Sequence, residues 1–160
     1  MTFRSMVLAL ASVAAVFCGV LFAGTFQGQQ DTPIVYRPPA LKLAENQQMN
    51  VYYFHGDVRC TTCKLIEKYT VEGVQQGFII PIGQGRLQQM SINVDRPENA
   101  HFIADFELIT RSVVVELTED DMPVAWRRLD RVWELVADEQ AFVDYLYAEM
   151  DRLNPGRRYD

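Results

Sequence analysis

The chain has 160 residues, of which 15 are Lys or Arg and 21 are Asp or Glu, so its formal net charge is −6 at pH 7. This length suits one compact domain with a short appendage. An acidic chain without a basic stripe argues against nucleic acid as the partner, because phosphate binding depends on clustered cations.

Residues 6–26 form a run of 21 residues without a charged side chain. A helix of that length just spans the hydrocarbon core of a bilayer. Arg4 and the amino terminus are positive, so the positive-inside rule keeps the N-terminus in the cytoplasm. We therefore expect residues 1–27 to be a transmembrane anchor of the bacterial inner membrane, with the soluble domain in the periplasm or at the cell exterior. The alternative is a signal peptide, whose cleavage would release the protein into the periplasm.

Residues 28–48 are polar and contain Pro33, Pro38 and Pro39, which predict an extended, semi-rigid linker. One or two helical turns are possible within it, over residues 40–45. The soluble domain is expected over residues 49–153, followed by a polar tail over residues 154–160.

The first half of the domain alternates strands and helices. A short aromatic and valine-rich run predicts a strand buried on both faces, and the apolar periodicity that follows predicts a helix. The expected elements are a strand over 50–55, a helix over 61–77, a loop over 78–86 and a second strand over 87–94.

The second half begins with a helix start, in which Asp95 is the expected cap, Pro97 lies in the first turn and Glu98 follows three residues after the cap. Turn chemistry and spacing then predict a β-hairpin, and Asp138 is expected to cap the final helix. The expected elements are strands over 112–117 and 124–129, a turn over 118–123 between them, and a helix over 138–153.

Cys60 and Cys63 are the only cysteines of the soluble part, because the third, Cys18, lies in the N-terminal apolar run. They stand three residues apart at the predicted junction of a strand and a helix. The helix dipole and the free N–H groups of the first turn favour a thiolate there, and the preceding Arg59 adds a cation. These are the requirements of a thiol–disulfide exchange site.

Other side chains near this pair are candidate supporting groups. His55 lies five residues before Cys60, where it can donate to a thiolate or supply a third metal ligand. Thr61 and Thr62 carry hydroxyls that can hydrogen-bond the thiolate. Two further interpretations of the cysteine pair stay open, a soft metal ion such as Cu(I) and an inert bridge.

The chain resembles the thioredoxin-like superfamily in its VYYF strand at residues 51–54, its RCTTCK segment at 59–64 and its FELITRSVVVEL segment at 106–117. The resemblance implies an α/β fold in which helices flank a central mixed four-stranded sheet in the order βαβαββα. Ser112 stands where these proteins usually carry a cis-proline facing the cysteines. Tyr52 and Tyr53 occupy the part of the strand that holds their buried acid.

The chain is also similar to a small bacterial group of thioredoxin-like proteins labelled as a nitrophenyl-compound nitroreductase subunit. No motif for flavin occurs, and we expect no cofactor.

From the residues and the resemblance together we expect a membrane-tethered, periplasm-facing thiol–disulfide oxidoreductase. Cys60 would attack a disulfide and Cys63 would resolve the mixed disulfide, with Ser112 among the supporting residues. The expected partners are protein thiols and disulfides close to the membrane into which residues 6–26 insert. The alternatives are a module that holds a soft ion through Cys60, Cys63 and His55, or a redox-inert interaction subunit with a thioredoxin fold.

Overall fold

The computed structural model of the protein describes residues 33–154, which fall within one compact unit. The anchor or signal segment expected over residues 1–27 therefore lies outside the described residues, as does most of the tail expected over 154–160. Within residues 33–154, no helix is both long and apolar enough to cross a membrane.

The unit is built on a mixed four-stranded sheet with the strand order β2-β1-β3-β4. Strand β1 runs parallel to β2 and antiparallel to β3, and β3 is antiparallel to β4. The strands are β1 Gln47–His55, β2 Leu87–Asn93, β3 Ser112–Glu119 and β4 Met122–Arg128. The two central strands, β1 and β3, are buried along nearly their whole length, which confirms the expected buried strand.

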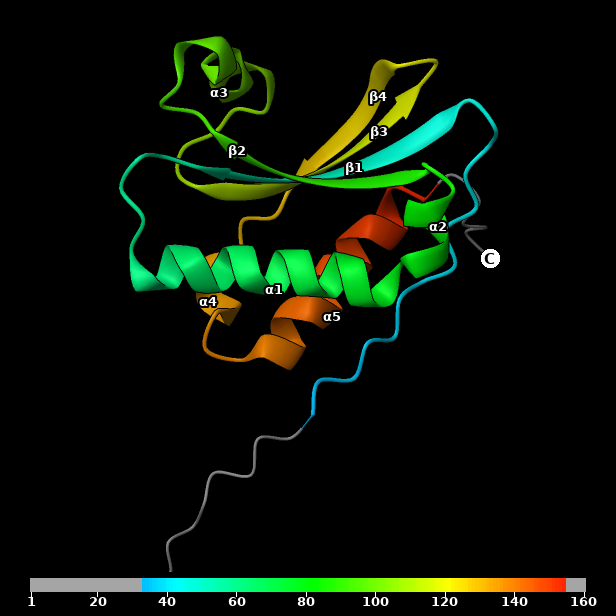
Figure 1. Cartoon of the computed structure of the whole chain (residues 1–160), viewed down its shortest axis with the longest axis horizontal. Coiled ribbons are helices and arrows are strands. Elements are labelled where there is room, and N and C mark those ends of the chain that lie inside the picture. The colour runs from blue at the N-terminus through cyan, green and yellow to red at the C-terminus, as the bar shows by residue number, and fades with distance from the viewer. Residues whose placement is uncertain (1–32, 155–160) are drawn as a thin grey trace, which may run out of the picture. The chain divides into compact units, whose positions relative to one another are not determined.

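Helices lie on both faces of this sheet. They are α1 Thr61–Gly77, α2 Ile79–Gly83, the 3₁₀ turn η1 Pro97–Asn99, α3 His101–Asp105, α4 Val132–Leu135 and α5 Glu139–Arg152. Figure 1 shows α1, α4 and α5 on one face of the sheet and α3 on the other. The expected α/β fold with a flanked, mixed sheet and the order βαβαββα is confirmed, with α2 and α4 as short additions.

Helices α1 and α5 pack against each other beneath the sheet, and both follow the sequence-based prediction. The carboxylate of Asp138 caps α5 as predicted, accepting from the backbone N–H of Ala141 at 3.0 Å. The Tyr147 hydroxyl of α5 donates to the carbonyl of Gly73 in α1 at 2.7 Å. Gly77 makes this contact possible, because a Cβ at that position would collide with the same hydroxyl.

The prediction of a loop over residues 78–86 is wrong in part, because α2 occupies Ile79–Gly83. Pro81 and Gly83 suggested an irregular segment. Pro81, however, is the third residue of α2, where a backbone N–H has no intrahelical acceptor, so its missing donor costs nothing.

The helix expected to begin at Asp95 is also different in the structure. The chain forms η1 at Pro97–Asn99 and then the short α3, and the residue that precedes η1 is Arg96. The Asp95 carboxylate does not cap a helix but accepts from the backbone N–H of Asp57 at 2.8 Å. Asp95 therefore ties the end of β2 to the loop that follows β1.

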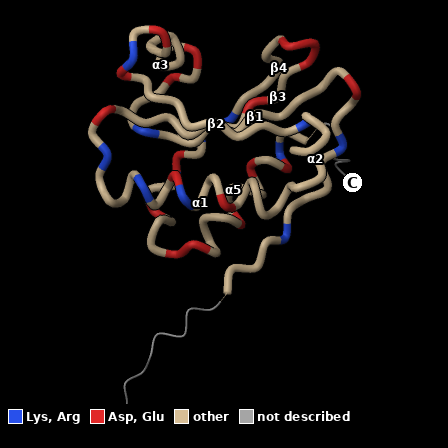
Figure 2. The backbone as a smooth tube through the Cα atoms, viewed as in Figure 1, with Lys and Arg blue, Asp and Glu red and all other residues tan. Residues whose placement is uncertain are grey.

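The predicted hairpin is confirmed, but its turn is tighter than the expected stretch over 118–123. Only Asp120 and Asp121 connect the strands, and both have left-handed backbone angles, with φ of 53° and 63°. A two-residue turn with this geometry matches the twist of the paired strands. The acidic residues consequently lie at the hairpin tip (Figure 2).

The sheet has a different apolar layer on each face. The larger layer lies under α1 and α5 and includes Tyr53, Ile66, Val115 and Leu146. The smaller layer covers the other face beside α3 and is mostly aromatic. Its buried residues are Tyr52, Phe54, Phe106 and Val114, with Phe102 and Trp126 packed against them.

The described part of the expected linker lies along the folded unit. Leu41 and Leu43 pack against the larger apolar layer. Asn154, at the end of α5, accepts from the Lys42 N–H at 2.9 Å and donates to the Ala40 carbonyl at 2.8 Å. The helical turns expected over residues 40–45 are not formed: residues 40–44 have no regular structure, a turn at residues 45–46 follows, and β1 begins at Gln47 rather than at residue 50.

Candidate functional site

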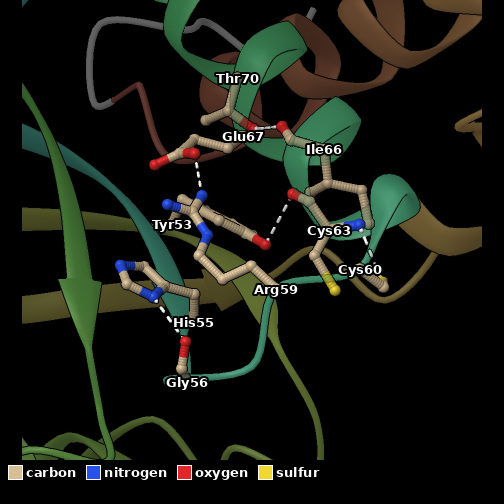
Figure 3. Close-up of polar contacts among 9 residues, drawn as sticks. All are labelled: Tyr53, His55, Gly56, Arg59, Cys60, Cys63, Ile66, Glu67 and Thr70. Carbon is tan, nitrogen blue, oxygen red and sulfur yellow. Dashed lines mark hydrogen bonds and ion pairs between the residues drawn. The ribbon is translucent and has the colours of Figure 1, made fainter.

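The two cysteines lie at the start of α1, after the loop that follows β1. Cys60 is the N-cap residue, with extended backbone angles (φ −74°, ψ 168°), and its side chain is exposed. Cys63 lies in the first helical turn with only 5% of its surface exposed. Both are free thiols, and Figure 3 shows them side by side at the helix end.

Hydrogen bonds from the first turn converge on the Cys60 sulfur. The backbone N–H of Cys63 donates to Sγ at 3.2 Å. The pKa of Cys60 is lowered, first by the hydrogen bond with the Cys63 side chain and then by backbone N–H groups that include those of Cys63 and Thr62. The expected role of a helix N-terminus thus has a concrete form here, since the unpaired amides of the first turn stabilise the thiolate.

Cys63 is shifted in the opposite direction. Burial raises the pKa of its thiol, and the hydrogen bond to Cys60 raises that pKa further. The cation of Arg111 opposes both effects by lowering it. The pair therefore consists of an exposed thiol that ionises readily and a buried thiol that keeps its proton.

Arg59 does not act on Cys60 in the way its position suggested. Its guanidinium forms an ion pair with Glu67 and lies 6.0 Å above the centre of the Tyr53 ring. Figure 3 shows the side chain directed toward Glu67 and away from Cys60. The Glu67 side chain is only 24% exposed, and a charge-assisted hydrogen bond to this partly buried carboxylate holds the guanidinium there.

Tyr53 connects β1 to the helix that carries the cysteines. Its buried hydroxyl donates to the carbonyl of Cys63 at 2.8 Å. Burial raises the pKa of Tyr53 to about 12, so the hydroxyl remains a donor throughout the neutral range. Tyr53 thus fixes the first turn of α1 from the buried strand β1.

His55 lies at the end of β1, where Nδ1 is 3.0 Å from the carbonyl oxygen of Gly56. Its ring stacks on Tyr53 with 5.9 Å between ring centres. Among the described residues, no three or more His, Cys, Asp or Glu side chains form a group that could hold a metal ion. The structure therefore does not bring His55 together with Cys60 and Cys63 as a three-ligand set.

The remaining predicted supporting residues lie near the cysteines in sequence or across the sheet. Thr61 and Thr62 open α1, and the contribution of Thr62 to Cys60 comes from its backbone N–H rather than from its hydroxyl. Ser112 begins β3 opposite Phe54, and its hydroxyl donates to the Thr110 carbonyl at 2.8 Å. No cis peptide bond occurs in residues 33–154.

Arg111 is the site residue that sequence reasoning missed. It lies directly before β3, and its backbone carbonyl accepts from the indole N–H of Trp133 at 2.9 Å. A Cβ on Gly56 would collide with the Arg111 guanidinium and with the Asp95 carboxylate, so these groups crowd the loop that leads to Cys60. The only signal in the sequence was a cation just before the strand that faces the cysteines.

Comparison with known proteins gives solved structures as the only matches, since no protein-family model and no curated protein matches the chain. Among the solved structures are three bacterial or plant proteins. Thioredoxin O2 from Arabidopsis thaliana in the oxidised state is 16% identical, and the match covers 62% of this chain and 76% of that chain with a TM-score of 0.37. Trxlp from Edwardsiella tarda is 20% identical, and the match covers 62% of this chain and 82% of that chain with a TM-score of 0.37. A thioredoxin from Thermus thermophilus is 14% identical, and the match covers 71% of this chain and 84% of that chain with a TM-score of 0.37.

These likenesses are distant, so the fold assignment depends on the strand order, the strand directions and the place of the cysteines. The mixed sheet flanked by helices, with a CxxC pair at the first strand-to-helix junction, is the thioredoxin-like fold that the sequence resemblance implied. The similarity to a nitroreductase subunit stays a prediction.

Proposed function

We propose that this protein is a thiol–disulfide oxidoreductase in which Cys60 attacks and Cys63 resolves. The observation that carries the proposal is the opposite character of the two thiols. Cys60 is exposed and has a lowered pKa, whereas Cys63 is buried and has a raised pKa. An attacking group must be accessible and ionised, and a resolving group must wait until the mixed disulfide has formed.

In the reducing direction, the Cys60 thiolate attacks one sulfur of a substrate disulfide and the other sulfur leaves as a thiolate. A mixed disulfide now joins Cys60 to the substrate. Cys63 then loses its proton, to water or to the departing thiolate, and attacks Sγ of Cys60. The substrate leaves with both sulfurs reduced, and the two electrons that it gained are balanced by the new Cys60–Cys63 disulfide. Oxidation of a substrate dithiol is the same sequence reversed.

Protein disulfides are the proposed substrates, and the surface near Cys60 supports this choice. Val58 and Ile109 are 79% and 86% exposed, on the two loops that approach each other through Gly56 and Arg111. Exposed apolar side chains on neighbouring loops suit transient contact with a protein surface.

The proposed location is the bacterial inner membrane, with the domain on the periplasmic or exterior side. The support is the uncharged run over residues 6–26 and the cation at Arg4. Full-length protein should sediment with membranes and remain there after carbonate extraction. Recovery of a soluble form with a new N-terminus near residue 27 would instead establish cleavage.

The redox proposal is tested in a Cys18→Ser background, so that only the pair contributes thiols. Cys60→Ser should abolish disulfide reductase activity, and Cys63→Ser should accumulate a mixed disulfide between Cys60 and the substrate. Loss of activity without any trapped species in Cys63→Ser would contradict the assigned order. Retained activity in Cys60→Ser would overturn the proposal itself.

A further inference from the structure

A cavity of about 500 Å³ lies on the sheet face opposite α1. It is lined by residues of the sheet strands β1, β3 and β4 and of α3, which lies on this face of the sheet in Figure 1. None of the residues around Cys60 and Cys63 lines it. The volume is within the range of sites for small molecules.

The floor of the cavity contains a buried carboxylate held only by neutral groups. Glu116 is 4% exposed, and its Oε2 accepts from the Tyr52 hydroxyl at 2.7 Å and from the Asn50 side-chain amide at 3.1 Å. The cavity lining includes no Lys or Arg. A buried carboxylate without a nearby cation is costly in the absence of a positively charged ligand.

Asn50 supplies an unused acceptor in the same floor. The residue is 6% exposed, and its Oδ1 is buried without a hydrogen-bond partner among the described residues. Buried polar atoms are almost always paired, so an orphaned carbonyl oxygen beside a carboxylate marks a place for an N–H donor. Its amide orientation is fixed, because only the NH₂ group can donate to Glu116.

The walls and the rim favour a cation as well. Phe106 and Trp126 meet edge to face at 5.7 Å, and both line the cavity. Aromatic faces attract cations. Asp105 and Asp121 stand at the rim, one on α3 and the other at the hairpin tip, where Figure 2 shows acidic residues. His101 lies 4.0 Å from the Asp105 carboxylate, so Asp121 is the freer of the two rim charges.

We propose that this cavity binds a small organic cation with N–H donors, such as a primary ammonium on an aromatic or aliphatic body. The ammonium donates to Glu116 and to Asn50 Oδ1, and its body packs against the Phe106 and Trp126 rings that line the cavity. The site is separate from the cysteine pair and binds whether or not the thiols react.

Calorimetric titration of the full chain with benzylammonium tests this assignment, with benzyl alcohol as the neutral probe. A ligand of this size that uses the site well should bind with a Kd of about 1 mM or tighter. Benzyl alcohol should bind at least about tenfold more weakly, because it cannot satisfy the buried charge. Lack of saturation at about 10 mM benzylammonium, or equal binding of the alcohol, would overturn the proposal.

Variants locate the binding in the cavity. Glu116→Gln keeps the shape and the Tyr52 contact but removes the charge, and should weaken benzylammonium binding by about tenfold or more. Glu98→Gln removes an exposed charge outside the cavity and should change nothing. Cys60→Ser should also bind normally, which separates this result from failure of the redox proposal.

Circular dichroism checks that Glu116→Gln is folded. Where that variant does not fold, Asp121→Asn decides the question, because asparagine tolerates the left-handed backbone of this turn residue. It should weaken benzylammonium binding by about twofold to threefold. Unchanged affinity in a folded Glu116→Gln, or in Asp121→Asn where it replaces that test, would overturn the assignment.

Discussion

The backbone N–H of Cys63 donates to the sulfur of Cys60 at 3.2 Å, so the residue proposed to resolve a mixed disulfide also stabilises the thiolate that would form it. The side chain of Cys63 adds the largest single contribution to the lowered pKa of Cys60. In return, the hydrogen bond between the two side chains raises the pKa of Cys63 and so helps to keep its thiol protonated. The two thiols thus divide their roles through one shared interaction.

Replacing the Cys63 side chain should separate these contributions. In a Cys18→Ser background, Cys63→Ala should raise the pKa of Cys60, because the side-chain hydrogen bond is lost while the backbone amides remain. Cys63→Ser, which keeps a donor, is the matched control and should raise it less. The measurement is the iodoacetamide alkylation rate of Cys60 against pH, whose midpoint should lie below the ordinary 9.0 in both variants. A midpoint at or above 9.0 in Cys63→Ser would remove the basis of the proposed attack.

Arg111 should assist the second step rather than the first. Its charge lowers the pKa of Cys63, against the larger effect of burial, so Arg111→Gln should raise that pKa further. We expect the mixed disulfide at Cys60 to persist several times longer, while the first alkylation rate of Cys60 stays nearly unchanged. Arg96→Gln, which removes an exposed cation paired loosely with Asp57, is the control. Equal slowing in both variants would argue for a general charge effect.

The exposed apolar residues should matter for protein substrates but not for small ones. Ile109→Asp and Val58→Asp are expected to slow reduction of a protein disulfide by about threefold to tenfold, since each loses apolar contact area. Reduction of a small aromatic disulfide should be almost unaffected. Ile80→Asp is the matched control, because Ile80 is 71% exposed but lies in α2, beyond the far end of α1. An identical effect of the Ile80 change would contradict docking near Cys60.

Gly77 should be the most sensitive glycine of the α1–α5 contact. Gly77→Ala places a Cβ against the Tyr147 hydroxyl and forces it away from the Gly73 carbonyl, so we expect a loss of about 1–3 kcal/mol in the free energy of unfolding. Gly83→Ala has open space around the new Cβ and should be neutral or slightly stabilising. Urea unfolding of the two variants measures the difference. A Gly77→Ala variant as stable as Gly83→Ala would show that α5 can shift without cost.

Much of the fold was predictable because its signals are local. The 61–77 helix follows from apolar periodicity, and the capping of α5 by Asp138 depends on atoms only three residues apart. The position of Cys60 at a helix N-terminus follows from the same short-range pattern. The signals for these features come from residues within a few positions of one another, so periodicity and capping rules are sufficient to find them.

The missed features depend on contacts between distant parts of the sequence. Asp95 satisfies every local requirement of an N-cap, yet it pairs with the backbone of Asp57 because β1 and β2 bring the two loops together. Arg59 precedes Cys60, but its guanidinium pairs instead with Glu67, eight residues further along the chain. Arg111 and the floor around Glu116 become visible only once β3 lies beside β1.

Three side chains hold residues 33–46 against the folded unit: Gln140 pairs with the backbone of Val35, Asn154 with Ala40 and Lys42, and Arg86 with Leu43 and Ala44. While these contacts persist, only residues 27–32 separate the apolar run at 6–26 from the packed part of the chain, and six residues span at most about 20 Å. Release of all of them would add residues 33–46 and extend the maximum span to roughly 70 Å. If residues 6–26 anchor the protein as proposed, these three side chains would together limit how far from the bilayer the thiols can work.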